Sequence, residues 1–240
     1  MLHKTRGIVL KAIRHTESSL ICRIYTEKFG LQSYLIYGAR KRKAKIPAAI
    51  LQPLHLLDMV VYHKNSGALQ KVSEARQLPL FEGIPYDVEK QTIILFLAEI
   101  LNKVIKLSEA EGPLFEFLYT MIVWFDGAKP PQRNFHLFFL LKLTQYLGIY
   151  PGLIFKEYDS RYRDTPYLAR EPGGRSLLKE TSVNEQWERL LNANVSDLNA
   201  LQFTTQSRRQ LLNSIISYYE EHLGNIEPLK SQPVLESVWA

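Results

Sequence analysis

Residues 20–45 read LICRIYTEKFGLQSYLIYGARKRKAK and predict two β-strands followed by a strongly basic loop. The segments Leu20–Glu27 and Leu31–Tyr37 are rich in β-branched and aromatic residues, which favour strands. Between them, Lys28–Gly30 ends on a glycine that can adopt the positive φ of a hairpin turn. The first part of the chain is therefore expected to contain an antiparallel β-hairpin.

Three further segments of the first eighty residues have the same character: Thr5–Arg14, Leu54–His63 and Leu69–Ala75. The last two are separated by Lys64–Gly67, a second candidate hairpin turn. Five strands without an intervening helical pattern, and a long basic connection from Gly38 to Pro53, predict a small, partly open barrel of the OB type. A five-stranded SH3-like barrel would give much the same pattern, so this alternative stays open.

After Pro79 the apolar period changes from two to 3.6, which predicts helices. Asp87 is a candidate N-cap, Ser182 opens a candidate capping box, and Gly224 is a candidate helix stop. The expected helices run from Asp87 to about Leu107, from Gly112 to Gly127, from near Asn134 to Gly148, from Ser182, and from about Thr205 to Leu223.

These patterns predict an α+β protein with two domains. An N-terminal five-stranded OB-type β-barrel is expected over residues 1–80, and an all-α helical bundle domain over residues 81–240. Between residues 150 and 180 the chain is rich in glycine, proline and charge, which predicts an irregular loop or small hairpin excursion from the bundle.

The basic loop carries five cations and no acid: Arg40, Lys41, Arg42, Lys43 and Lys45. Such a cluster repels itself unless a polyanion neutralises it, and phosphates that release their counterions are the strongest physical reason to build one. We therefore interpret it as a nucleic-acid contact. The alternative is a solvated loop without a partner, as many short charge runs are.

Charge is divided unevenly along the chain. Residues 1–80 hold fourteen Lys and Arg against four acids, a net charge of +10, whereas residues 81–240 hold sixteen against twenty, a net charge of −4. This asymmetry predicts two modules with different partners, of which the first binds nucleic acid.

Catalytic motifs are missing from the sequence: there is no GxxxxGK[ST], HExxH or GxSxG, and the six histidines lack metal-ligand spacing. The single cysteine, Cys22, excludes an intramolecular disulfide and a cysteine-based zinc site, and is expected to be a small packed side chain. We expect no enzyme activity, no cofactor and no metal. Without a signal peptide or a long apolar segment, the chain is expected to be cytoplasmic and to have no membrane partner.

Several segments together resemble the RecO family of bacterial recombination mediators. They are TRGIVLKAIRHTESS (residues 5–19), residues 20–45 with their Gly-Ala-Arg-basic element, Leu51–Pro53, and EHLGNIEPLKS (residues 221–231). The likeness covers nearly the whole chain in the same order.

The resemblance implies a non-enzymatic, nucleoid-associated protein of the cytoplasm. RecO-like proteins bind single- and double-stranded DNA, anneal complementary strands, engage the acidic C-terminal tail of the single-strand-binding protein, and join RecR to load RecA. Many members carry two CxxC pairs in the excursion, whereas residues 151–178 have none. The resemblance thus implies a zinc-free subdomain, packed on Phe155, Tyr158, Tyr162 and Tyr167.

Two sets of site residues follow. The residues expected to bind DNA are Arg14, Arg23, Tyr37, Arg40, Lys41, Arg42, Lys43 and Lys45. Tyr25 is a further candidate for stacking on a base, and strand alternation places Tyr34 on the face opposite Tyr37. The residues considered for binding the partner peptide are Lys129, Arg133, Phe139, Lys142, Arg208 and Arg209. The alternative is that the aromatic stripe on this helix belongs to the core, as such stripes usually do. A generic RNA-binding OB protein is the alternative function, and an enzyme a more distant third.

Overall fold

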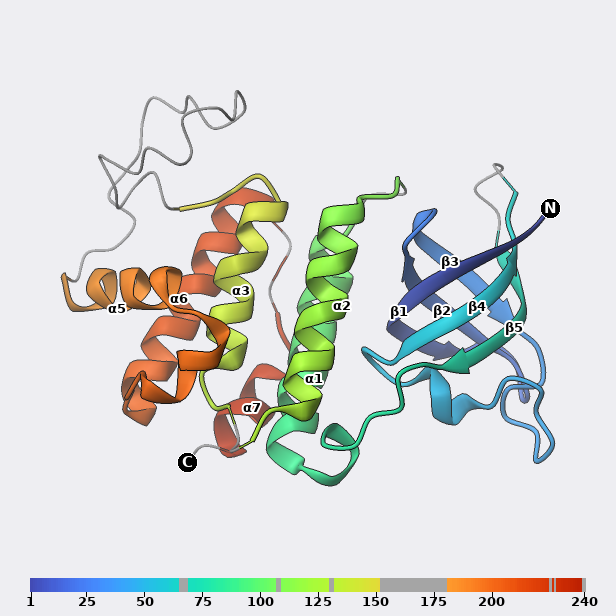
Figure 1. Cartoon of the computed structure of the whole chain (residues 1–240), viewed down its shortest axis with the longest axis horizontal. Coiled ribbons are helices and arrows are strands. Elements are labelled where there is room, and N and C mark those ends of the chain that lie inside the picture. The colour runs from blue at the N-terminus through green and yellow to red at the C-terminus, as the bar shows by residue number, and fades with distance from the viewer. Residues whose placement is uncertain are drawn as a thin grey trace. The chain divides into compact units, whose positions relative to one another are not determined.

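In a computed structural model, the first eighty residues form a five-stranded barrel (Figure 1). The structure describes residues 1–64, 69–106, 109–129, 132–151, 181–224, 226 and 228–238. The strands are β1 (Leu2–Arg14), β2 (Leu20–Thr26), β3 (Gly30–Ile36), β4 (Leu56–Tyr62) and β5 (Gln70–Gln77). All five predicted strands are therefore confirmed. Part of the predicted second hairpin turn, residues 65–67, lies outside the described residues.

The strand order β1-β2-β3-β5-β4 closes into a barrel of the OB type, which confirms the predicted fold class. Closure depends on a short parallel pairing of β3 with β5, which joins Tyr34 to Gln70 and Leu35 to Lys71. The other neighbours pair antiparallel along most of their length. The barrel is thus closed where the sequence predicted a partly open one.

Alternate residues of each strand fill the barrel interior. Cys22, Ile24 and Tyr34 are fully buried there, beside Met59 of β4. Burial raises the pKa of the Cys22 thiol to about 12, so the side chain stays protonated, as expected of a packed cysteine.

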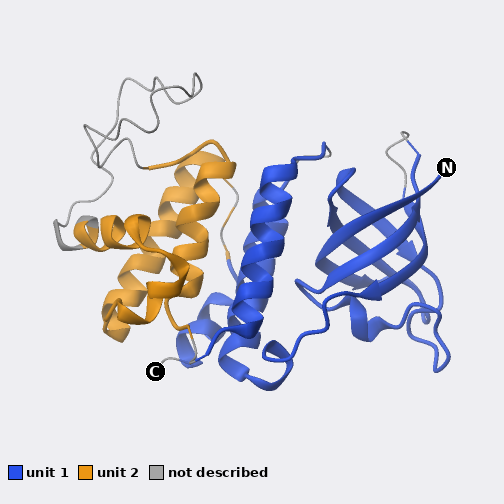
Figure 2. Ribbon diagram, in the orientation of Figure 1, with its two compact units in different colours: residues 1–129, 229–238 blue, residues 130–228, 239–240 orange. Residues whose placement is uncertain are grey.

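The helices fall into two compact units (Figure 2). The first unit, residues 1–129 and 229–238, contains the barrel with α1 (Val88–Val104), α2 (Gly112–Gly127) and α7 (Gln232–Val238). It also holds the short 3-10 helices η1 (Ala48–Leu51) and η2 (Ile84–Tyr86). Asp87 caps α1 by accepting a hydrogen bond from the backbone N–H of Lys90 at 3.0 Å, as predicted, whereas α7 was not foreseen.

The second unit contains α3 (Phe135–Tyr146), α5 (Thr181–Asn192), η4 (Val195–Ala200) and α6 (Thr205–Leu223). α3 packs against α5 and α6. Helix α6 ends at Gly224, which has a φ of +61° and donates its N–H to the carbonyl of Glu220. Contacts therefore group α1 and α2 with the barrel, while the division predicted at residue 80 stays a prediction.

The predicted excursion, with its four aromatic residues, lies at residues 152–180, outside the described part of the chain. In the described helices, none is both long enough and apolar enough to cross a membrane.

The connection from the barrel to α1 is held by buried polar groups. The carboxylate of Asp126 accepts hydrogen bonds from the backbone N–H groups of Glu82, Gly83 and Ile84 at 2.7–2.9 Å. A methyl group built on Gly83 would lie 2.1 Å from the carbonyl oxygen of Asp126, so only glycine fits there. Lys90, 4% exposed, donates to the carbonyls of Asp126 and Ala128. This connection fixes the end of α2 against the start of α1.

Candidate nucleic-acid interface

The basic loop, residues 38–45, is anchored to the barrel at both ends. Ala39 is 3% exposed and Ile46 is 5% exposed, and both belong to the barrel core. The backbone N–H of Ala48 donates to the carbonyl of Ala39 at 2.9 Å, which closes the base of the loop. The five cations between these anchors are all exposed: Arg40, Lys41, Arg42, Lys43 and Lys45.

The loop also lies against the turn between β1 and β2. The backbone N–H of Arg40 donates to the carbonyl of Ser18 at 3.2 Å, and its guanidinium donates to the carbonyl of Glu17 at 2.9 Å. Gly38, with a φ of +67°, starts a turn that the N–H of Lys41 closes at 3.0 Å. Arg14, exposed at the end of β1, lies at the other end of the same β1–β2 turn.

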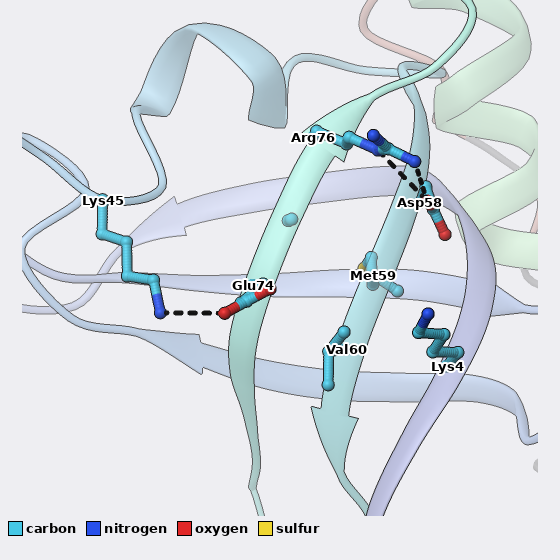
Figure 3. Close-up of a pocket in the computed structure, with 8 residues that line it drawn as sticks. Lys4, Lys45, Asp58, Met59, Val60, Glu74 and Arg76 are labelled. Atoms are coloured by element: carbon cyan, nitrogen blue, oxygen red, sulfur yellow. Dashed lines mark hydrogen bonds and ion pairs between the residues drawn. The ribbon is translucent and has the colours of Figure 1, made fainter.

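The charge of the loop is hardly compensated. Among the described residues, Arg40, Lys41, Arg42 and Lys43 form no ion pair. Lys45 reaches Glu74 of β5 at 3.5 Å, but both side chains are about two-thirds exposed (Figure 3). A solvated pair of this kind contributes little stability. Four or five cations are therefore available to a polyanion.

Two other predicted contact residues are occupied within the protein. Arg23 points from β2 to α1 and donates to the side-chain oxygen of Asn102 at 2.8 Å and to its carbonyl at 3.2 Å. Tyr25 is fully buried, and its hydroxyl donates to the carbonyl of Glu111 at 3.4 Å. Burial raises the pKa of Tyr25 to about 12. Helices α1 and α2 thus cover this part of the outer surface of β2.

Arg6 of β1 also contacts α2, one of the two helices that cover the outer surface of β2. Its guanidinium bonds to Glu27 at 2.9–3.0 Å and to Glu116 of α2, and lies over the rings of Phe115 and Tyr119. The hydrogen bonds from Arg6 lower the pKa of Glu27. The sequence analysis did not identify this cluster, because Glu116 is 110 residues from Arg6.

Tyr34 of β3 and Tyr37, the residue directly after this strand, differ in the way that strand alternation predicts. Tyr34 is fully buried in the barrel, whereas Tyr37, at the start of the basic loop, is 65% exposed. Tyr37 is therefore the accessible aromatic side chain of this pair.

Comparison with known proteins shows the family of the chain. Family models described as "Recombination protein O N terminal" and "Recombination protein O C terminal" match residues 1–81 and 85–157. The chain belongs to the RecO family. The DNA repair protein RecO of Flavobacterium johnsoniae is 34% identical over 99% of both chains, that of Flavobacterium psychrophilum 35% over 99%, and that of Bacteroides fragilis 32% over the full length of both.

The residues considered for a partner peptide differ in their burial in this RecO-family chain. In the second unit, Phe139 is fully buried and its ring lies 5.8 Å from that of Phe135. Lys142 donates to the carbonyl of Leu191 at 2.8 Å, and Arg208, 8% exposed, donates to the carbonyl of Phe203. The exposed members of this set are Lys129 in the first unit and Arg133 and Arg209 in the second.

Sequence reasoning missed a set of exposed residues on the outer surface of β1, β4 and β5. Lys4, Lys71 and Arg76 are single cations within strands, so no charge run draws attention to them. Tyr62, at the end of β4, is 45% exposed. Strand alternation alone would place Lys71 and Arg76, an odd number of residues apart in β5, on opposite faces. The bulge that brings them to one face is a feature of the pairing with β4 that the sequence does not reveal.

Proposed function

We propose that this RecO-family protein is a recombination mediator of DNA repair that binds single- and double-stranded DNA through the basic loop. The observation that carries the proposal is the state of Arg40, Lys41, Arg42 and Lys43. They are exposed on a loop whose ends are buried in the barrel, and no described acid pairs with them. A rigid base removes part of the entropic cost of ordering the loop on a phosphate backbone.

The mechanism is binding without chemical turnover. Cations that replace the counterions of phosphates give an affinity that falls steeply with salt and depends little on base sequence. Two complementary strands held on one positive surface repel each other less, while their base edges stay available for pairing. Annealing follows from this arrangement.

The finer steps rest on family membership. As a mediator, the protein would engage the acidic tail of the single-strand-binding protein, join RecR and help to load RecA onto single-stranded DNA in the cytoplasm, at the nucleoid. The exposed side chains of Arg133 and Arg209 offer charge complementary to an acidic tail. The buried Phe139 supplies no accessible apolar surface to such a peptide in this conformation.

The test is fluorescence anisotropy of labelled single-stranded and duplex DNA over a salt series. We compare the wild type with a variant in which Arg40, Lys41, Arg42 and Lys43 are all Ala. A matched control removes four exposed cations elsewhere: Lys28, Lys106, Arg189 and Lys230. Each lost phosphate contact lowers the log–log salt slope by about 0.7 on single strands, so the loop variant is expected to lose up to about 3 and the control almost nothing.

Equal slopes for the loop variant and the wild type would contradict the proposal. Annealing of complementary strands coated with single-strand-binding protein, and binding of its tail peptide, test the mediator role separately. An RNA competitor that binds at least as well as DNA, together with no binding of the tail, would favour a generic RNA-binding protein instead.

A further inference from the structure

The outer face of β1, β4 and β5 presents an ordered set of side chains. Pairing across the three strands makes three rows: Leu2 beside Tyr62 and Lys71, Lys4 beside Val60 and Glu74, and Arg6 beside Asp58 and Arg76. A bulge after Val60 keeps Lys71 and Glu74 on the same side of β5. Of this set, Arg6 turns to Glu27 and Glu116, while Asp58 and Arg76 pair with each other.

A shallow groove of about 370 Å³ runs over the middle of this face, and its polar lining is mostly cationic (Figure 3). Lys4, Lys45 and Arg76 line it together with Asp58 and Glu74. Arg76 donates to Asp58 at 2.8 Å while it remains 72% exposed, and Lys45 reaches Glu74 at 3.5 Å. Because such exposed pairs are weak, a phosphate can replace either carboxylate at little cost.

One end of the face is apolar and aromatic. Leu2 is 54% exposed and Tyr62 is 45% exposed, and they are direct neighbours across β1 and β4. Lys71 is the partner of Tyr62 on the other side, in β5. An accessible ring beside a cation is the combination on which unpaired bases stack in proteins that bind single strands.

The face is continuous with the basic loop. Lys45 belongs to the loop, yet its ammonium group reaches across to Glu74 in the middle of β5 (Figure 3). Arg76 and Lys4 line the same groove as Lys45, so a strand that leaves the loop at Lys45 meets these two cations next.

We propose that the outer face of β1, β4 and β5 is a second contact surface for single-stranded nucleic acid. Lys4, Lys71 and Arg76 bind phosphates, and the ring of Tyr62 stacks on an unpaired base. Asp58 and Glu74 hold the cations in position when nucleic acid is absent and compete with its phosphates when it is present. This inference rests on the proposed function, because it extends the path of the same ligand from the loop.

Comparing affinity for duplex DNA with affinity for single-stranded DNA distinguishes the contribution of this face from that of the basic loop. A paired base in a duplex cannot stack on Tyr62, whereas an unpaired base can. Tyr62→Leu is therefore expected to lower affinity for single-stranded DNA about tenfold and to leave duplex affinity unchanged. Tyr62→Phe keeps the ring and should retain wild-type affinity. Tyr86→Leu, which removes a tyrosine that is 86% exposed in η2, is the matched control and should change neither affinity.

Removing an acid from this face should raise the affinity for single-stranded DNA, the opposite of the effect of Tyr62→Leu. Glu74→Gln frees Lys45 from its carboxylate and is expected to raise affinity for single strands about threefold and to steepen the salt slope by about 0.7, one phosphate contact. Glu188→Gln, which removes an exposed acid of α5, is the control for the change in net charge.

A crosslink supplies a direct readout. Single-stranded DNA that contains 5-iodouracil should crosslink to Tyr62 in the wild type, and peptide mapping should place the adduct at the end of β4. Loss of salt dependence in the loop variant with no effect of Tyr62→Leu would overturn this inference but leave the proposed function intact. Equal losses of single-strand and duplex affinity in Tyr62→Leu would also overturn it. If DNA produced no crosslink at Tyr62 and a polyanionic peptide crosslinked there instead, the surface would be a protein-binding face.

Discussion

The cations of the basic loop and the cations inside the molecule have opposite roles. Arg40 to Lys43 are exposed and form no ion pair within the described residues. Arg23 and Lys90 instead donate to main-chain carbonyls or to Asn102. The first group can exchange its counterions for phosphates, whereas the second group already satisfies groups of the protein. The same residue types thus divide into cations that are available to a ligand and cations that stabilise the fold.

The difference teaches that net charge alone does not locate a binding surface. The first eighty residues have a net charge of +10, but part of that charge is committed to the cover formed by α1 and α2. What distinguishes the two groups is how deeply the hydrogen bonds of the cation lie. The guanidinium of Arg40 donates to Glu17 at an exposed turn, whereas that of Arg23 donates to Asn102, 79 residues away, at a partly buried site.

The largest expected effect comes from an interior cation. Lys90→Met removes two charge-assisted hydrogen bonds from buried carbonyls of Asp126 and Ala128, and should lower the free energy of unfolding by about 3 kcal/mol. Chemical denaturation measures this loss. Lys106→Met, at an exposed position, should change it by less than about 0.5 kcal/mol. If the two variants were equally stable, Lys90 would not hold the connection between α1 and α2.

A second test uses a basic group that the interior keeps neutral. Burial lowers the pKa of His136 to about 3, with the charge of Arg208 acting in the same direction. Below about pH 6.5 the unfolded chain binds a proton that the folded state does not, so stability is complete above that pH and falls as the pH drops. Between pH 7 and pH 5 the loss from this residue is about 2 kcal/mol.

The His136→Gln variant isolates this contribution. Its unfolding free energy should fall less steeply with pH than that of the wild type, by about one proton, whatever its stability at pH 7. His55, whose pKa burial also lowers, leaves a residual slope in both proteins. Parallel slopes for variant and wild type would contradict a neutral, buried His136.

A smaller effect is expected from a comparison of alanine variants at Arg23 and Arg14. Arg23→Ala should lower the free energy of unfolding by about 1–2 kcal/mol because it leaves Asn102 without its donor, while the salt slope for DNA binding stays at the wild-type value. Arg14→Ala should instead flatten the salt slope and leave the free energy of unfolding unchanged, since Arg14 is exposed at the end of β1. Thermal unfolding and anisotropy on the same samples measure both. Should Arg23→Ala flatten the salt slope, the comparison between interior and exposed cations would fail.

The fold could largely be predicted because its evidence is local. Alternation marked the strands, and Asp87 and Gly224 marked helix ends through short-range hydrogen bonds that the structure contains. Helix α7 was missed because its position depends on a distant residue: Glu99 of α1 accepts hydrogen bonds from the N–H groups of Lys230 and Ser231. Closure of the barrel was missed for a similar reason, since it depends on two residue pairs between β3 and β5.

The site was partly predictable for the same physical reason. A run of cations such as Arg40 to Lys43 cannot bury itself, so sequence alone indicates its exposure. Arg23, a single cation in a strand, gives no such indication, and its partner is a tertiary contact. Tyr62 and Lys71 become neighbours only through the pairing of β4 with β5, which their sequence separation conceals.

Lysine acetylation of the wild-type protein, followed by mass spectrometry, most directly tests whether the loop cations contact DNA while the interior cations stabilise the fold. The reaction is run with and without saturating single-stranded DNA. Lys41, Lys43 and Lys45 should react readily alone and be protected by DNA, while the interior Lys90 and Lys142 should react slowly in both states. Lys106 and Lys230 should react equally in both. Loop lysines that react at the same rate in the presence of bound DNA would contradict the account.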